Sequence, residues 1–197
     1  MENEEILLGL ESTKEKTSED EDYSLIRKFN DGDDHSFTLL VSKHREKVRN
    51  LVYLTLNESE PVDDIAQDVF ISVFYNIREF RYESKFTTWL YRITINKCRD
   101  FLRKKKVRSI FVSVDEEEYP HTRSFQPDNE VTKLVNEAIQ RLPEKLKTPL
   151  VLRDIDGLSY KEISDQLGCE IGTIKSRIFR ARETLKIILE PYQNDLY

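Results

Sequence analysis

Cysteine and histidine are scarce in this chain, which has two Cys and three His among its 197 residues. Cys98 and Cys169 lie far apart in the sequence, and neither belongs to a CxxC pair. The histidines, His35, His44 and His121, do not show the spacing of metal ligands. The sequence therefore predicts two ordinary core thiols, with no metal site and no cofactor.

Long apolar runs are also absent. No run approaches the roughly 20 apolar residues that span a bilayer, and the N-terminal stretch "MENEEILLGLESTKEK" lacks the basic-then-apolar order of a secretory signal. Charged residues make up 35% of the chain. We therefore expect a soluble protein that works in the cytoplasm and does not insert into a membrane.

Acidic and basic residues are segregated along the chain, although the formal net charge is -6. Residues 1–22 hold nine acidic side chains against two lysines, and residues 113–130 hold six acidic side chains against one arginine. Between them, residues 85–108 hold nine basic side chains and one acidic side chain. A local basic stripe attracts phosphate whatever the total charge of the chain, so a polyanion partner is compatible with this composition.

The apolar pattern indicates helices throughout. Apolar residues recur every four positions from Ile65 to Ile77, behind Pro61 and an acidic pair, which is typical of a helix and its start. The sequence predicts an all-α fold of two small helical domains joined by an acidic linker, the second domain ending in a helix-turn-helix. The expected segments are a disordered acidic extension over 1–22, a first domain over 23–107, a linker over 108–129, a second domain over 130–190 and a tail over 191–197.

Glycine and proline divide the second domain into short helices. Three of the five glycines fall there: Gly157, Gly168 and Gly172. Ser159 followed by Glu162 is the pattern of a capping box, which predicts a short helix that ends at Gly168. We expect Pro149 to kink the helix that Pro143 begins, or to start a second one.

The next helix should have an apolar stripe on one side and a basic face on the others. The stripe consists of Ile174, Ile178, Ala181, Leu185 and Ile188. The polar face consists of Thr173, Lys175, Ser176, Arg177, Arg180 and Arg182. A short helix, a tight turn and a longer basic helix are typical of a helix-turn-helix, whose second helix enters the major groove of DNA. The alternative is a solvated basic face with no partner.

Two stretches resemble a known family. "GLSYKEISDQLGCEIGTIKSRIFRARETLK" closely resembles the promoter-reading helix-turn-helix of the extracytoplasmic-function sigma factors, with Ser164 in a position where alanine is usual and Cys169-Glu170 in the turn. "DDIAQDVFISVF" followed by "FRYESKFTTWLYRITINKCRDFLRKKK" resembles the polymerase-binding and minus-ten-reading helices of that family. Together the two resemblances cover about 25–107 and 130–190.

The resemblance implies an alternative sigma factor, which performs no chemistry itself and confers promoter specificity on core RNA polymerase. The second domain would read the minus-thirty-five element as duplex through the six polar residues given above. The first domain would read the minus-ten element as melted strand through Lys85, Phe86, Trp89, Tyr91, Arg92, Asn96, Arg99 and Arg103. In the family, the "RYESKF" loop builds a pocket for a flipped base.

The physical pattern of the first domain agrees with strand capture. Trp89, Arg92, Asn96, Arg99 and Arg103 recur at spacings of three and four, so they share one helix face. Unpaired bases stack on aromatic rings while cations hold the backbone. An isolated tryptophan is also a common core residue, and the three aromatics of this helix could divide between core and DNA in more than one way.

The resemblance also assigns partners. The family's polymerase-binding helix docks on the clamp helices of the largest polymerase subunit, and the matching residues are Asp64, Gln67, Asp68 and Phe70, of which Phe70 packs there or inward. The second domain would contact the polymerase flap, and the acidic linker would lie in a positively charged polymerase channel. Promoter DNA is the other partner, and an anti-sigma factor is a family expectation.

Two other function classes compete with this interpretation. A helix-turn-helix activator or repressor that is not a polymerase subunit would explain the second domain but not the docking helix or the Trp89 face. A metal-dependent nuclease would need the carboxylates Asp63, Asp64 and Asp68, and no second motif completes such a site. Binding to core polymerase would distinguish a sigma factor from a helix-turn-helix regulator. Activity that does not depend on a metal ion would argue against a nuclease.

Overall fold

The computed structural model describes residues 19–56, 58, 60–111 and 130–195. Every regular element among these residues is helical, which confirms the predicted all-α fold. After helical residues 19–30 come α2 (Asp34–Leu56), α3 (Val62–Asn76), η1 (Ile77–Glu79), α4 (Phe86–Phe111), α5 (Glu130–Gln140), α6 (Glu144–Leu150), η2 (Val151–Ile155), α7 (Tyr160–Leu167), α8 (Ile171–Leu189) and η3 (Glu190–Asp195).

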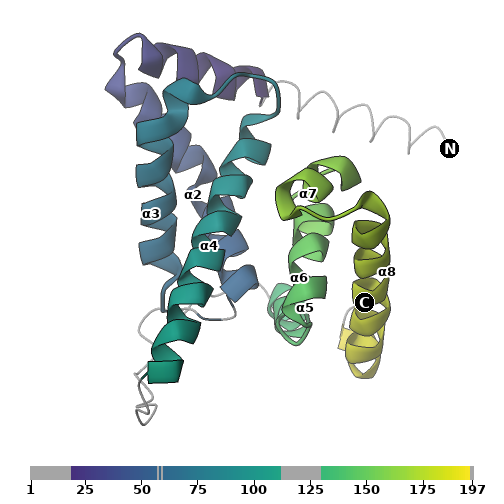
Figure 1. The fold of residues 1–197 in the computed structure, drawn as a ribbon. Coiled ribbons are helices and arrows are strands. Elements are labelled where there is room, and N and C mark those ends of the chain that lie inside the picture. The colour runs from purple at the N-terminus through teal and green to yellow at the C-terminus, as the bar shows by residue number, and fades with distance from the viewer. Residues whose placement is uncertain (1–18, 57, 59, 112–129, 196–197) are drawn as a thin grey trace, which may run out of the picture.

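The helices form two units that stand side by side (Figure 1). In the first unit α2, α3 and α4 pack against one another, and in the second α6 packs against α8 and α7 against α8. The predicted apolar repeat of α3 is confirmed, because Val69, Val73 and Ile77 are fully buried and Ile65 nearly so. No helix in the described part of the chain is long and apolar enough to cross a membrane.

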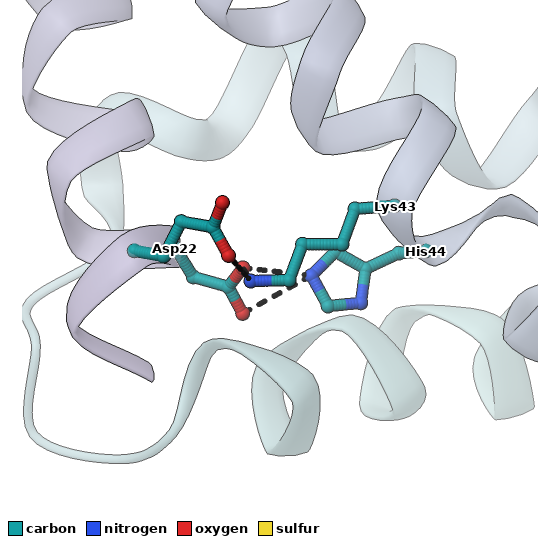
Figure 2. Close-up of polar contacts among 4 residues, drawn as sticks. Asp22, Lys43 and His44 are labelled. Carbon is teal, nitrogen blue, oxygen red and sulfur yellow. Dashed lines mark hydrogen bonds and ion pairs between the residues drawn. The ribbon is translucent and has the colours of Figure 1, made fainter. Parts of the chain in front are cut away.

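The first unit begins earlier than the sequence indicates. Residues 19–22 are helical, whereas the sequence predicts a disordered extension over 1–22. The cause is Asp22, which is only 2% exposed. Its carboxylate oxygens lie 3.0 Å from Nε2 of His44, and Oδ1 lies 2.7 Å from Nζ of Lys43 (Figure 2). A buried carboxylate is stable only when it is paired in this way, so these contacts fix the helix to α2.

Replacing Asp22 with Asn is expected to lower the free energy of unfolding by about 2–3 kcal/mol at pH 7, because Lys43 and His44 lose their charged partner. Burial raises the pKa of Asp22, but hydrogen bonds from His44 and Lys43 outweigh it and the pKa lies below its ordinary value. Such a carboxylate stabilises the fold above the pKa of the unfolded chain, and the contribution disappears as pH falls through the folded pKa. Urea unfolding at pH 7 and below roughly pH 4 measures the difference.

The matched control for this experiment is Glu46→Gln. Glu46 makes an exposed pair with Arg49 on α2, with its own side chain 68% exposed, and such pairs contribute little. An Asp22→Asn variant that unfolds like Glu46→Gln at pH 7 would contradict the structural role of the buried carboxylate.

In the second unit, proline and glycine act partly as the sequence indicates. Pro149 lies inside α6, and the chain continues as the π-helical turn η2 instead of starting a new helix. Proline has no N–H to donate, which removes one helical hydrogen bond and favours this local widening. Ser159 and Glu162 form the predicted capping box, and Gly168 ends α7 in a left-handed conformation with φ 63°.

The predicted apolar stripe of α8 is confirmed. Ile174, Ile178 and Ala181 are buried, and the two later members of the α8 stripe pack against the core. In α4, Leu90 is fully buried. This helix continues to Phe111, so the first residues of the predicted linker are helical, and the rest of that linker lies outside the described residues.

Candidate nucleic-acid and polymerase interfaces

The predicted strand-reading residues of α4 share one face. Arg92, Asn96, Arg99 and Arg103 are exposed, and Trp89 is half-buried at the N-terminal end of the same stripe. They follow one another at three- and four-residue intervals, so they lie above one another on the helix. The face therefore presents an indole edge, an amide and a row of guanidinium groups.

Two aromatic residues predicted for this site are placed in the core instead. Phe86 is 1% and Tyr91 is 2% exposed. The Phe86 ring packs edge-on against the His44 ring, with 5.3 Å between centroids. Burial, together with the nearby carboxyl group of Asp156 in the second unit, raises the pKa of Tyr91. Neither side chain has surface to offer DNA in this arrangement, which corrects the expectation for both.

Trp89 and the loop before α4 form the wall of a cleft of about 940 Å³. The Trp89 ring lies 5.5 Å from Phe80 and 5.9 Å from Phe86, measured between centroids, so one side of the indole is supported by the core. From the first unit the cleft is also lined by Arg78, Arg81, Glu79, Glu83, Ser84, Thr88 and Arg92. An aromatic ring beside several guanidinium groups is suited to an unpaired base and its phosphates.

Tyr82 is a residue of this region that the sequence interpretation does not single out, although it lies in the "RYESKF" loop. Among described residues other than glycine, it is the one with positive φ, at 59°. Its exposed ring packs against Tyr23, 5.4 Å away, and Arg27 lies 5.7 Å from its centroid. An aromatic residue in this conformation is unusual, and such backbone strain is typical of functional loops.

The basic face of α8 is divided between two flanks of its buried stripe. At 100° per residue, Thr173, Ser176, Arg177 and Arg180 lie on one flank, and the other two predicted residues lie on the opposite flank. Arg177 is half-buried and donates a hydrogen bond to Sγ of Cys169, 3.4 Å away. The remaining three residues of its flank are exposed.

Lys175 and Arg182 face the start of the second unit's short helix. Nζ of Lys175 lies 5.6 Å from the ring centroid of Tyr160. Arg182 makes a two-point ion pair with Asp154, at 2.9 and 2.6 Å, which raises the pKa of Arg182. The pair is partly exposed and contributes about 1 kcal/mol or less, so a phosphate could replace the carboxylate at little cost.

The turn of the helix-turn-helix is supported by the two unusual residues noted in the sequence. The hydroxyl of Ser164 donates to the backbone oxygen of Cys169, 2.5 Å away. A serine in the usual alanine position thus holds the turn directly. Cys169 is half-buried, whereas Cys98 is fully buried, and burial raises the pKa of Cys98 to about 12. Both are free thiols, and Cys98 is the ordinary core thiol predicted from the sequence.

The predicted polymerase-binding residues occupy the exposed side of α3. Asp64, Gln67 and Asp68 are exposed, whereas Phe70 is half-buried and packs inward on the core. The same stripe continues to Ile71 and Tyr75, which are 46% and 76% exposed. These two apolar residues were missed, although the spacing of three and four residues from Asp64 would have found them.

One of the three carboxylates considered for a nuclease is engaged elsewhere. Asp63 forms an ion pair with Arg49, with Oδ1 2.8 Å from Nε. Within the described ranges, no group of three His, Cys, Asp or Glu residues is placed to hold a metal ion.

Two family models match the chain. The sigma-70 region 2 model matches residues 40–108, and the sigma-70 region 4 model matches residues 132–185. The first match contains α3 and most of α4, and the second contains most of the second unit, including α7 and most of α8.

The chain is similar over most of its length to curated sigma factors. It is 36% identical over 184 residues to the ECF RNA polymerase sigma-E factor of Haemophilus influenzae, covering 86% of this chain and 96% of that relative. It is 34% identical over 188 residues to the RNA polymerase sigma-H factor of Pseudomonas aeruginosa, covering 88% and 96%. The sigma-E factor of Escherichia coli K12 is 35% identical over 182 residues, covering 86% and 95%.

Two solved structures share the fold. CnrH in complex with the cytosolic domain of CnrY has a TM-score of 0.63 at 24% identity, covering 87% of this chain and 98% of that chain. The sigma factor RpoE in complex with the anti-sigma factor NepR, from Bartonella quintana, has a TM-score of 0.64 at 23% identity, covering 78% and 96%.

Proposed function

Because the chain belongs to the extracytoplasmic-function group of the sigma-70 family of RNA polymerase sigma factors, we propose that its two helical units carry out separate steps of promoter recognition. As a sigma factor it binds core RNA polymerase and directs promoter-specific initiation of transcription. The observation that carries the proposal is the exposed α4 face, where Trp89 and the guanidinium groups of Arg92, Arg99 and Arg103 lie together.

The first unit, in this proposal, captures the melted minus-ten strand. Trp89 and Tyr82 supply stacking surfaces, and each base stacked on a ring gains about 1–3 kcal/mol. Lys85 and the α4 arginines hold the backbone, and the amide of Asn96 reads a base edge. Phe86 and Tyr91 support this face from the core. Bases that flip out of the duplex bind to this face, and this binding offsets part of the free energy needed to melt the promoter. Because the gain differs between bases, the net free energy of melting depends on the promoter sequence.

The second unit reads the minus-thirty-five element as duplex. Thr173, Ser176, Arg177 and Arg180 face the major groove, where arginine makes two hydrogen bonds to guanine. The free N–H groups at the start of α8 favour a phosphate. Lys175 and Arg182, on the other flank, bind the DNA backbone. This division assigns sequence reading to one flank and positioning to the other.

The exposed stripe of α3 docks on the clamp helices of the polymerase. Asp64, Gln67 and Asp68 provide the polar contacts, and Ile71 and Tyr75 extend the surface with apolar area. An exposed aromatic residue beside charges is typical of an interface hot spot. The second unit also contacts the polymerase flap. The protein acts in the cytoplasm and catalyses no reaction itself. An anti-sigma factor is a further proposed partner.

Transcription in vitro with core RNA polymerase and a library of promoter fragments tests the proposal. A sigma factor should direct initiation from fragments that share two spaced motifs. If the polymerase does not bind the chain while duplex fragments are still retained, the protein is a helix-turn-helix regulator that works outside the polymerase.

Replacing Arg180 with Ala should weaken binding to duplex fragments that carry the upstream motif and reduce the slope of log affinity against log salt. The loss of one phosphate contact lowers the slope by about 0.9, whereas the loss of a base contact costs about 1–3 kcal/mol and leaves the slope nearly unchanged. Fluorescence anisotropy over a range of salt concentrations measures both quantities. Lys186→Ala, in the last turn of α8, is the matched control. Equal effects of the two variants would contradict the assignment of Arg180.

A further inference from the structure

A small polar hollow lies where the two units meet. The units pack together through contacts of α2 with α5 and α6. At this contact Nε2 of Gln140 on α5 donates to the backbone oxygen of Tyr53 on α2, 3.0 Å away. Thr55, on the same helix α2, lines a hollow of about 190 Å³ together with residues of α4, α6, α7 and α8, whose arrangement can be followed in Figure 1. Both units therefore contribute to its walls.

The base of the hollow carries buried hydroxyl groups. Thr55 is 5% exposed and Thr148 of α6 is 8% exposed. Oγ1 of Thr55 is fully buried and has no hydrogen-bond partner among the described residues. A buried polar atom without a partner costs free energy, so an orphaned hydroxyl that faces a hollow indicates a polar ligand there.

Positive charges surround the opening of the hollow. Arg99 of α4, Lys145 of α6 and Arg177 of α8 line it, and the carboxylate that lines it is Glu144. None of the three cations makes an ion pair with a described residue. Positive charges gathered in one place repel one another unless a negative charge compensates them. A water molecule would satisfy the Thr55 hydroxyl but not these charges, so the lining favours an anion.

The donors are suited to an anion of the phosphate type. A guanidinium group has five N–H donors, and Arg177 uses Nη1 to donate to Sγ of Cys169, 3.4 Å away. This contact orients the side chain and leaves its other N–H groups available. Arginine forks and hydroxyl groups together match the several acceptor oxygens of a phosphate.

The size of the hollow limits the ligand further. Its volume of about 190 Å³ is below the roughly 300–1,000 Å³ of pockets that take drug-sized molecules. A phosphate or diphosphate group fits this space, whereas the nucleoside part of a nucleotide would lie outside it.

We propose that this hollow is a binding site for a compact phosphate anion, which is held between the two units by Arg99, Lys145 and Arg177, with the hydroxyl groups of Thr55 and Thr148 at its base. Inorganic phosphate, diphosphate and the terminal phosphates of a nucleotide share this chemistry. Because the ligating residues come from both units, the anion binds only the folded, packed chain and stabilises it by mass action.

The site has a consequence for DNA binding, and this consequence rests on the proposed function. Arg177 is proposed to read the upstream duplex and Arg99 to hold the melted strand. An anion in the hollow occupies donors of both side chains, so it competes with the DNA for them. Anion binding itself depends on neither polymerase nor promoter.

Calorimetric titration and thermal unfolding of the full chain test the site. Inorganic phosphate, diphosphate and adenosine triphosphate are compared with sulfate and chloride at equal ionic strength, without divalent cations. Diphosphate should bind and raise Tm, and sulfate should have a smaller effect. If adenosine triphosphate binds no more tightly than diphosphate, the free anion is the ligand; tighter binding identifies a nucleotide as the source of the phosphate.

Two variants separate ligand binding from folding. Thr55→Val keeps nearly the same shape and removes a hydroxyl that has no partner in the protein, so the free energy of unfolding should not fall, while diphosphate should bind about tenfold more weakly. Lys145→Gln should weaken diphosphate binding about fivefold. The matched control is Lys133→Gln, an exposed lysine of α5 that does not line the hollow and should bind diphosphate like the wild type.

Either of two results would overturn the proposal. One is an equal response of the wild type to diphosphate, sulfate and chloride, and the other is an equal affinity of Thr55→Val and the wild type for diphosphate. The titration contains no polymerase and no DNA, so its failure is distinct from failure of the proposed function, which transcription in vitro tests.

Fluorescence anisotropy with a duplex fragment tests the competition. At constant ionic strength, diphosphate should weaken duplex binding by the wild type more than by Lys145→Gln, because the variant holds the anion less tightly. Equal weakening of the two proteins would show that the anion does not compete with DNA.

Discussion

Replacing Trp89 with Ala is expected to reduce promoter-specific transcription about 10- to 100-fold without weakening binding to core polymerase. The physical reason is the loss of one stacking platform, which is worth about 1–3 kcal/mol per base. Trp89 stands at the end of the exposed α4 stripe with one side of its ring supported by Phe80. The loss should therefore appear at the step where the promoter melts, measured by permanganate reactivity of unpaired thymines and by run-off transcription.

The control for this prediction is Trp89→Phe, which keeps a ring at the same position. Because Trp89 is half-buried, Trp89→Ala also lowers stability to some extent, so thermal unfolding of both variants is measured beside activity. A promoter template with a pre-melted minus-ten bubble should restore part of the transcription by Trp89→Ala, since the melting cost is then absent. If Trp89→Ala melts promoters as well as the wild type, Trp89 is a core tryptophan and the stacking role belongs to Tyr82.

Local patterns predicted the second unit well. The capping box of Ser159 and Glu162, the stop at Gly168 and the buried stripe from Ile174 are all decided by neighbours within a few residues. Such interactions are encoded in consecutive sequence, and helix periodicity then assigns the faces. The same periodicity placed Arg92, Asn96 and their partners of the α4 face together.

The aromatics of α4 could not be assigned in this way. Phe86 and Tyr91 are buried because residues distant in the sequence surround them: His44 of α2 packs on Phe86, and Asp156 of the second unit lies close enough to Tyr91 to act on its pKa. Asp22 was assigned to a disordered extension for the same reason, since its partners lie on α2. Tertiary contacts of this kind override composition and local pattern, and a single sequence does not reveal them.

The division of the α8 basic face has a similar origin. The sequence predicts one polar face of six residues, but the buried stripe divides these residues between two flanks of α8. On the flank away from Arg180, Asp154 forms an ion pair with Arg182. A list of basic residues therefore overstates the reading surface. The geometry favours four residues for reading the major groove and two for positioning on the DNA backbone.

Reversing the charge of Asp68 on α3 should abolish most of the affinity for core polymerase. Asp68 lies in the middle of the exposed stripe that runs from Asp64 to Tyr75, so a lysine there would replace a negative charge of the proposed docking surface with a positive one. We expect Asp68→Lys to weaken the binding free energy by about 2–3 kcal/mol, which corresponds to a roughly 30- to 150-fold increase in Kd. Most of this increase should come from slower association. Surface plasmon resonance with immobilised core polymerase measures the association and dissociation rates.

The control is Glu60→Lys, an exposed carboxylate just before α3 that makes the same charge change outside the stripe. Both positions are exposed, so each variant should unfold within about 0.5 kcal/mol of the wild type. Asp68→Lys should also fail in transcription while its free second unit still retains duplex fragments, because α3 and α8 belong to different units. If Asp68→Lys and Glu60→Lys bind polymerase equally well, then α3 is not the docking helix, and its exposed Ile71 and Tyr75 must serve another partner.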